Sequence, residues 1–424
     1  MWLNFVECVF FDHLTFDHMV TIQTGRAQLW NETNQDKLKK DLFANYDRFS
    51  KPTEHFNITK VKFGVSILHL EADERRSTVT VQSWLRMIWN DPKLQWNESD
   101  YGNVSVLRIA DHEVWHPDLY LYNSASGGEP LIRFGAPNVL VYPNGEVLFV
   151  PPVEQKILCE FDLRYWPFDT QYCKLKYGSW VHHGYEIELS LYNSEARIDL
   201  SDLLLLHTWN ITHTTGEVLL TTYDCCPQPY YALVFNFTIT RNSHTYTTMV
   251  ITPSVVSTFF LLTQFGLPPY AKEKIILNGC SLVLLNLFLL YFNHQIYTAG
   301  AQTPLIVLFY SSSLYIAGLT TLSAVVTSWM CTVRNTNKPL SNCLRKLLQT
   351  FVKWLFIEQY PCVSTYQERG ELDEIKDDED TDKKHTHTHT NLIQNEWTIL
   401  AVCIDRLLFI MCIFTFIILA IRLS

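Results

Sequence analysis

Four long apolar segments in the second half of the chain restrict its possible folds more than any other feature. They cover roughly residues 244–266, 275–292, 304–329 and 398–422. Each is close to the ~20 residues that an α-helix needs to cross about 30 Å of hydrocarbon. Buried helices of a large soluble domain are the alternative, but four segments of this length favour a transmembrane bundle.

Basic residues in the connections between these segments indicate how the chain crosses the membrane. The first connection contains Lys272 and Lys274, and the second, from 293 to 303, contains no lysine or arginine. The third includes Arg334, Lys338, Arg345, Lys346 and Lys353. Because basic loops stay in the cytoplasm, we expect the N-terminal half and the short C-terminus to lie outside the cell.

The polar first half of the chain agrees with this orientation. It contains N-glycosylation sequons at Asn31, Asn57, Asn97, Asn103 and Asn210. Asn236 begins another, but lies close to the membrane and is a weaker candidate. The formal net charge of −10 argues against a nucleic-acid partner. We see no nucleophile–base pair and no metal-ligand spacing, so we expect neither an enzyme nor a cofactor.

Short strand patterns separated by turns predict that the first half folds as a β-sandwich. In the segment from 77 to 89, alternate residues form an apolar face: Val79, Val81, Leu85, Met87 and Trp89. Trp84 shares the opposite, polar face with Arg86. A large aromatic residue there is either an isolated surface residue or part of an interface or ligand wall, and the pattern alone leaves both open.

Two adjacent cysteines, Cys225 and Cys226, lie among tyrosines and prolines in the segment TTYDCCPQPYY. Consecutive α-carbons are about 3.8 Å apart, which is closer than an ordinary disulfide allows. A strained bond between the two, pairing with other cysteines, and two free thiols are therefore all compatible with the spacing.

Composition divides the chain into five parts. Residues 1–29 start with an apolar segment that lacks a basic region, so it makes a poor signal peptide and could be the remnant of one. The other parts are the β-sandwich (30–242, beginning with a short capped helix within 30–47), the first three spans (243–330), a cytoplasmic loop (331–396) and the fourth span (397–424).

The cytoplasmic loop carries two further patterns. Residues 339–356 predict an amphipathic helix on the inner membrane surface. The repeat HTHTHT at 385–390 is of low complexity, and we do not expect a metal site there.

The segment CEFDLRYWPFDTQYC, from Cys159 to Cys173, resembles the signature loop of the Cys-loop receptors, which are pentameric ligand-gated ion channels. The adjacent Cys225 and Cys226 narrow the resemblance to nicotinic acetylcholine receptor subunits of the α type, and we expect an invertebrate one. The resemblance implies a plasma-membrane protein with an extracellular immunoglobulin-like β-sandwich and a four-helix transmembrane bundle. It also implies disulfides between Cys159 and Cys173 and between Cys225 and Cys226.

The same resemblance implies a ligand site between subunits, in a box of aromatic rings. One subunit would supply Tyr122, Trp180, Tyr223 and Tyr230, with Cys225 and Cys226 on the capping loop, and its neighbour would supply Trp84. Such rings bind a small cationic agonist through their electron-rich faces. Because one chain carries the residues of both sides of this site, a homopentamer is geometrically possible.

The chain departs from the family pattern behind these rings. Val181, His182 and His183 replace the usual Thr-Tyr-Asp, and Ser126 replaces a usual aspartate. Lys176 lacks its usual aspartate partner, since Ala232 and Leu233 stand at that place. A cationic amine is therefore a firmer expectation than acetylcholine itself.

Further matches concern the transmission of ligand binding to the membrane. Glu74, Asp169 and Arg241 match acidic and basic residues that couple the outer domain to the spans. Asp405 and Arg406 match a charged pair in the last span, which we expect to form a mutual salt bridge.

The second span would line the pore. The residues on one helical face are Glu273, Ile276, Cys280, Val283, Leu287, Tyr291 and His294. Glu273 favours inorganic cations, although Lys272 and Lys274 are expected to weaken its field. A ring of Ile276 side chains favours dewetting, which blocks ions. We expect a cation channel subunit that contacts identical or related subunits and membrane lipid; a non-conducting, auxiliary ligand-binding subunit is the alternative.

Overall fold

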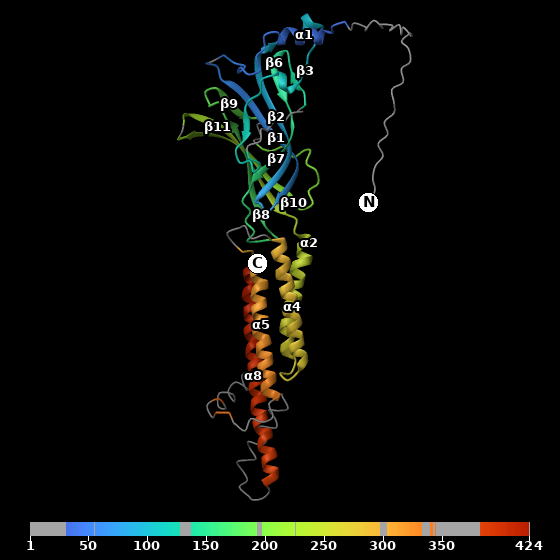
Figure 1. The fold of residues 1–424 in the computed structure, drawn as a ribbon, viewed down its shortest axis with the longest axis vertical. Helices are drawn as coiled ribbons and strands as arrows, with labels where there is room; N and C mark the ends of the chain where they lie inside the picture. Colours follow the sequence, from blue (N-terminus) through green and yellow to red (C-terminus); the bar gives the residue numbers. More distant parts are fainter. Residues whose placement is uncertain are drawn as a thin grey trace, which may run out of the picture.

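The structure is a computed structural model of the 424-residue chain. It describes residues 31–54, 56–127, 137–192, 197–224, 226–296, 303–332, 340–341, 344 and 382–423, and in the last range it describes the side chains of 395–422. The predictions for residues 1–29, for Cys225, and for most of the amphipathic helix at 339–356 lie outside these residues. Figure 1 shows an elongated molecule in which a β-sandwich stands on a bundle of long helices.

The first described element is the short helix α1 (Asn34–Phe43), at the end of the β-sandwich away from the bundle. Thr33 starts it with a capping box, since its side chain accepts from the backbone of Asp36 and the Asp36 carboxylate accepts from the backbone of Thr33. Leu38 is fully buried, so α1 is fixed to the sandwich by its apolar face.

Two sheets form the sandwich. The larger one has the order β3 (Leu107–Ile109), β5 (Val139–Val141), β6 (Asn144–Phe149), β2 (Thr78–Gln95), β1 (Thr59–Asp73) and β9 (Ile187–Leu191), and β7 (Pro152–Leu158) also pairs with β2. The smaller one has the order β10 (Trp209–Tyr223), β11 (Cys226–Arg241), β8 (Thr170–Ser179) and β4 (Leu119–Leu121).

The core lies between the two sheets. The predicted apolar face of β2 is buried there, whereas Trp84 on its other face is half-buried. Phe63 of β1 contacts Tyr177 of β8 and Phe235 of β11, with ring centroids 4.7 and 6.0 Å apart. The predicted disulfide between Cys159 and Cys173 is present, with its α-carbons 5.3 Å apart, and it joins the end of β7 to β8. The sheets are therefore linked by packing and by a covalent bond.

Four helical segments are long and apolar enough to span a membrane. The first joins α2 (His244–Tyr246), η3 (Thr247–Ile251), α3 (Thr252–Thr263) and η4 (Gln264–Gly266); the others are α4 (Lys272–Gln295), α5 (Leu305–Thr332) and α8 (Asp382–Leu423). The element η3 is a π-helical turn just before Pro253, whose missing N–H interrupts the regular helical hydrogen bonds.

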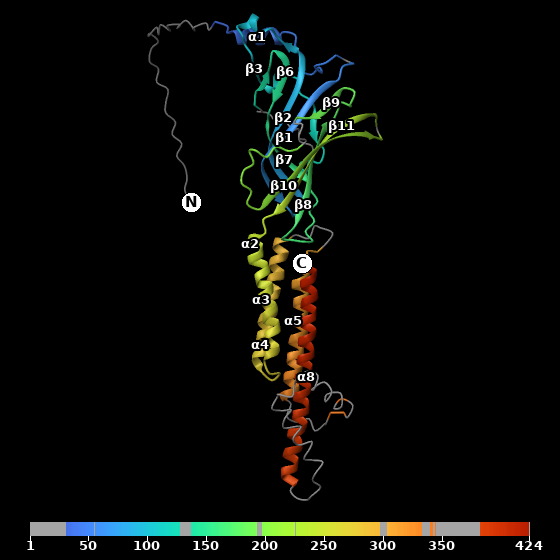
Figure 2. The same cartoon turned by 180° about the vertical axis from the view of Figure 1, so that it is seen from behind.

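The last helix, α8, begins at Asp382, earlier than the start at 397 that apolarity predicts. Figure 2, seen from behind, shows α8 beside α5 as Figure 1 does, with the C-terminus at the junction with the sandwich. The C-terminal end of the chain therefore lies on the same side of the bundle as the sandwich, as expected from the loop charges.

The bundle contains a buried ion pair that the sequence did not predict. Asp405 Oδ2 accepts a hydrogen bond from Lys274 Nζ of α4 at 2.5 Å, whereas the pairing of Asp405 with Arg406 stays a prediction. Adjacent residues on a helix do not face each other, so Asp405 is free to point toward α4. Lys274 is fully buried and paired with Asp405, so the two opposite charges offset each other inside the bundle.

Candidate functional site

A group of aromatic side chains gathers where β4 and β8 end. Tyr122 follows β4 and Trp180 follows β8, and their rings meet edge to face with centroids 6.3 Å apart. The ring of Tyr120 also lies near Trp180, with centroids 5.8 Å apart. The Trp180 side chain is 68% exposed, so it presents an open aromatic surface.

The β10–β11 hairpin brings the other two predicted rings to the same place. Tyr223 and Tyr230 meet edge to face, with centroids 5.8 Å apart. Burial, followed by the nearby Tyr223, Asp118 and Tyr230, raises the pKa of Tyr122 above its ordinary value. Tyr122 is therefore a neutral phenol, and its Oη donates to the Ser179 carbonyl at 2.6 Å. Four predicted ligand residues form one cluster.

A glycine is required beneath Tyr122. A Cβ added to Gly178 would lie 2.4 Å from Tyr122 Oη and 2.5 Å from its Cζ. Any larger residue at position 178 of β8 would push the phenol ring of Tyr122 out of the cluster.

Asp118 positions Trp180, and the sequence analysis missed it. Its carboxylate accepts hydrogen bonds from the backbone amides of Trp180 and Val181 at 3.0 and 2.6 Å, and from Ser179 Oγ at 2.6 Å. Its backbone carbonyl also accepts from the Trp180 amide. The signal was its place in the segment WHPDLYLY, directly before β4, which Tyr122 follows.

We expect Asp118→Asn to weaken ligand binding about 5- to 30-fold, because charge-assisted hydrogen bonds to backbone amides are each about twice as strong as neutral ones. Equilibrium binding of acetylcholine to the purified chain checks this. Asp111→Asn, an equivalent change on the nearby η2 (Asp111–Glu113), is the control and should leave affinity unchanged. Equal affinities for both variants would contradict the assigned role.

The residues that depart from the family pattern form a different polar network. His182 donates its backbone amide to Ser179 Oγ at 2.9 Å, and its Nδ1 lies 3.1 Å from Glu186 Oε2. Lys176 Nζ lies 5.8 Å from the centroid of the Tyr122 ring. Ser179 thus connects His182 to Asp118, which positions Trp180.

Trp84 lies apart from the other rings. It belongs to β2 of the larger sheet, where it pairs in register with Ser66 of β1 and Pro152 of β7. Tyr122, Trp180, Tyr223 and Tyr230 lie at the smaller sheet. Within one chain, Trp84 is therefore not part of the cluster formed by the four other rings.

The tip of the β10–β11 hairpin is described in part. Cys226 begins β11 and pairs with Tyr223 of β10. Cys225 lies outside the described residues, so the bond between Cys225 and Cys226 stays a prediction.

The three predicted coupling residues meet at the base of the sandwich. Arg241 Nε and one of its terminal nitrogens donate to the two carboxylate oxygens of Asp169 at 2.6 and 2.9 Å, and Nη1 donates to Glu74 Oε1 at 2.6 Å. The side chains of Arg241 and Asp169 are 2% and 1% exposed. Trp209 covers the guanidinium at 4.3 Å. Arg241 therefore ties the start of the first span to β1 and to the loop before β8.

The predicted pore-lining residues share one face of α4. All seven are exposed in the single chain: Glu273, Ile276, Cys280, Val283, Leu287, Tyr291 and His294. The opposite face is buried and includes Lys274, Asn278 and Leu285. The exposed face of α4 is therefore the one on which the helical repeat placed the seven residues, and it is free to face a pore or neighbouring subunits.

The sequon asparagines are placed as glycosylation requires. Asn31, Asn57, Asn97, Asn103 and Asn210 are all exposed. Asn236 is half-buried, and its Nδ2 donates to Glu217 Oε1 at 3.2 Å. The five exposed asparagines are therefore accessible for glycosylation, whereas the side-chain amide of Asn236 is already hydrogen-bonded.

Comparison with known proteins agrees with this architecture. Residues 35–243 match the family described as "Neurotransmitter-gated ion-channel ligand binding domain". Acetylcholine receptor subunit beta-like 1 of Drosophila melanogaster is 35% identical over 277 residues, which cover 64% of this chain and 52% of that protein. Neuronal acetylcholine receptor subunit alpha-2 of Gallus gallus is 33% identical over 333 residues, which cover 77% of this chain and 62% of that protein.

Neuronal acetylcholine receptor subunit alpha-5 of Homo sapiens is 32% identical over 343 residues, covering 79% of this chain and 70% of that protein. The chain spans less than two thirds of the length of the Drosophila and chicken relatives. A β-sandwich with an aromatic site, standing on four apolar helices, defines the class of neurotransmitter-gated ion-channel subunits. Within it, the chain belongs to the family of nicotinic acetylcholine receptor subunits, multi-pass plasma-membrane proteins whose N-terminal domain is extracellular.

Proposed function

We propose that this chain binds a small cationic amine, such as acetylcholine, between subunits of a pentamer and thereby gates a cation-selective pore. The observation that supports this most is the division of the aromatic residues. Four rings cluster at the end of the smaller sheet, and Trp84 lies on the larger one. Two copies placed side by side would bring the two groups together.

Rings alone can hold a quaternary ammonium in such a site. Each desolvated contact with an aromatic face contributes up to about 2 kcal/mol. The nearby carboxylate of Asp118 already accepts three hydrogen bonds from the protein. Direct contact with the cation therefore comes from the ring faces, which favours amines without a hydrogen-bond donor, while the negative charge of Asp118 adds a longer-range attraction.

The charges at the inner end of α4 favour cations. Glu273 is exposed on the face proposed to line the pore, whereas Lys274 is buried and paired with Asp405. In a pentamer, five Glu273 side chains would surround the inner mouth. Pairing with Asp405 offsets the charge of Lys274, which supports selectivity for inorganic cations.

Expression of the chain alone, with current recording against a panel of amines, tests the proposal. We expect quaternary amines to evoke a cation current that permeant anions do not carry. Binding of the same amines without any current would support an auxiliary subunit that needs partners. Neither binding nor current with any amine of the panel would refute the proposed ligand class.

A non-conducting subunit is the second candidate, and Ile276 favours it. This side chain is 66% exposed, one turn above Glu273 on the same face of α4. A ring of five isoleucines at this depth would favour dewetting of the pore.

We expect Ile276→Thr to raise spontaneous or amine-evoked current at least several-fold, because a hydroxyl ring lets water remain in the constriction. Single-channel and whole-cell recording measure this. Ile275→Thr is the matched control, since the same change at a half-buried neighbour points away from the proposed pore. Large currents from the unchanged chain that Ile276→Thr does not alter would contradict a barrier at this residue.

A further inference from the structure

A buried hydrogen-bond network connects three helical segments near the start of α4. Asn278 of α4 donates its side-chain amide to Gln264 Oε1 of η4, and its Oδ1 accepts from Thr320 Oγ1 of α5 at 3.2 Å. The Gln264 amide in turn donates to the Leu261 carbonyl at 3.0 Å. The Thr320 hydroxyl also lies 3.0 Å from the Ala317 carbonyl, so its one hydrogen is divided between two acceptors. The three polar residues are buried, with 0%, 1% and 3% exposed for Gln264, Asn278 and Thr320.

Asn278 lies opposite the proposed pore face of α4. It is two residues from both Ile276 and Cys280, which corresponds to about 200° around a helix with 3.6 residues per turn. Lys274, one turn before Asn278 on the same buried face, pairs with Asp405 of α8. The packed face of α4 thus starts with polar groups, whereas much of its exposed face is apolar.

Apolarity alone does not fix how α4 is rotated about its own axis. Ile275, Ile276 and Leu277 are all apolar, although successive residues point in directions about 100° apart. Inside a membrane bundle, apolar side chains gain little from facing protein rather than lipid, so their pattern does not select one rotation. Asn278 is different, because rotation by one position would remove its amide from both partners and leave buried polar groups unsatisfied.

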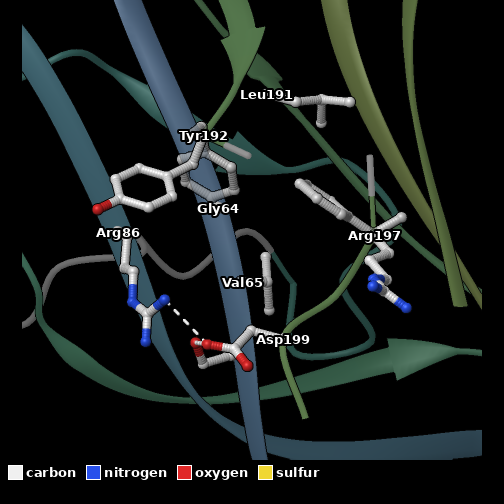
Figure 3. A pocket seen from close by; sticks show the side chains of 10 residues that line it. Gly64, Val65, Arg86, Leu191, Tyr192, Arg197 and Asp199 are labelled. Carbon is white, nitrogen blue, oxygen red and sulfur yellow. Dashed lines mark hydrogen bonds and ion pairs between the residues drawn. The ribbon is translucent and has the colours of Figure 1, made fainter. Parts of the chain in front are cut away.

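The same loss would cost less where water reaches the partners. Arg86 Nη1 of β2 lies 2.9 Å from Asp199 Oδ2 at the larger sheet, as Figure 3 shows, and the two side chains are 26% and 22% exposed. Water can solvate either side chain if the other moves away. Gln264 and Asn278 are buried inside the bundle, so an amide that loses its partner there stays unsatisfied. The network therefore favours one orientation of α4.

We propose that Asn278 is a positioning residue that fixes the rotation of α4 through Gln264 and Thr320, and so determines which side chains face the pore. This inference rests on the proposed function, since it takes α4 as the pore-lining helix. Lys274 holds α4 less tightly, because its long flexible side chain keeps contact with Asp405 over a range of rotations. A single buried asparagine selects the register of coiled coils in the same way.

Disulfide formation between subunits measures this rotation. Each variant carries one new cysteine on a Cys280→Ser background: Ile275→Cys, Ile276→Cys or Leu277→Cys. The three positions lie within about 3 Å along the helix axis but point about 100° apart. The full chain is oxidised in membranes with copper phenanthroline, and dimers are quantified on non-reducing gels, with the Cys280→Ser background alone as the blank. Ile276→Cys should give most of the dimers, because it faces the pore axis.

Asn278→Leu should spread the dimers to a neighbouring position. Two interhelical hydrogen bonds change the ratio of helix orientations by about tenfold. The dimer yield of Ile275→Cys or Leu277→Cys, relative to that of Ile276→Cys, should rise by this factor.

Further variants separate orientation from stability. Asn286→Leu is the matched control, since Asn286 Nδ2 donates to the Leu282 carbonyl of its own helix at 2.8 Å, and its dimers should stay at position 276. The double variant Gln264→Leu with Asn278→Leu removes both amides of the pair, so it should assemble but still lose the restriction to position 276. If neither Asn278 variant assembles, Thr320→Val decides, because it keeps the side-chain shape and removes the donor to Asn278.

The pattern of dimers decides between the outcomes. Dimers confined to Ile276→Cys in the unchanged chain and in Asn286→Leu, but spread in the Asn278 variants, support the inference. Confinement to Ile276→Cys in every variant that assembles overturns it. If Ile276→Cys forms no more dimers than its two neighbours while Asn278 is intact, the pore face itself is wrong, and the proposed function fails with it.

Discussion

Replacing Arg241 by methionine should destabilise the folded chain by about 3–5 kcal/mol, because it removes one partner of a buried ionic group. Asp169 would remain almost fully buried, with two carboxylate oxygens that have lost a doubly hydrogen-bonded guanidinium. Glu74, which is 21% exposed, would lose its partner at the same time. We expect little protein at the cell surface and a much lower midpoint of thermal unfolding.

The control for this variant is Lys60→Met. Lys60 lies 3.7 Å from Glu188, and their side chains are 77% and 37% exposed. An exposed pair of this kind contributes about 0–1 kcal/mol, so its loss should hardly be detectable. Thermal unfolding of the purified full chain, followed by tryptophan fluorescence, compares the two. Similar midpoints for Arg241→Met and Lys60→Met would show that the buried cluster does not stabilise the junction.

Replacing Trp180 by alanine should weaken binding of a quaternary amine by about 30-fold. One desolvated cation–π contact is worth up to about 2 kcal/mol, each 1.4 kcal/mol is tenfold in affinity, and indole is the best aromatic partner. The side chain is 68% exposed in the single chain, so its removal should cost little folding free energy.

Calorimetry with acetylcholine measures this effect. Tyr172→Ala is the control, because Tyr172 is a 76% exposed ring on β8, the strand that leads to Trp180. It should bind normally. Equal binding by the unchanged chain and Trp180→Ala would remove the central residue of the proposed site.

Periodicity explains why much of the architecture could be predicted from sequence. The buried face of β2 follows the two-residue alternation of a strand, and the exposed face of α4 follows the helical repeat. Both are local patterns, set by backbone geometry. Sustained apolarity likewise revealed the four spans, although it could not reveal the polar start of α8 at Asp382.

Contacts between distant residues could not be predicted in this way. Lys274 and Asp405 are 131 positions apart, and their pairing becomes visible only in the folded bundle, where α4 and α8 both pack against α5. Asp118 supports Trp180 across 62 positions, and no spacing rule connects the two. The aromatic residues were found through a family resemblance, whereas the groups that position them needed coordinates.

The most direct test of the central claim, a ligand site shared by two subunits, is to mix two defective chains. Trp180→Ala and Trp84→Ala should each lose binding of acetylcholine when expressed alone. Co-expressed, they should form some interfaces with an intact Trp180 on one side and an intact Trp84 on the other, and binding should return to a fraction of the sites. No recovery in co-assembled pentamers, or normal binding by Trp84→Ala alone, would contradict a site between subunits.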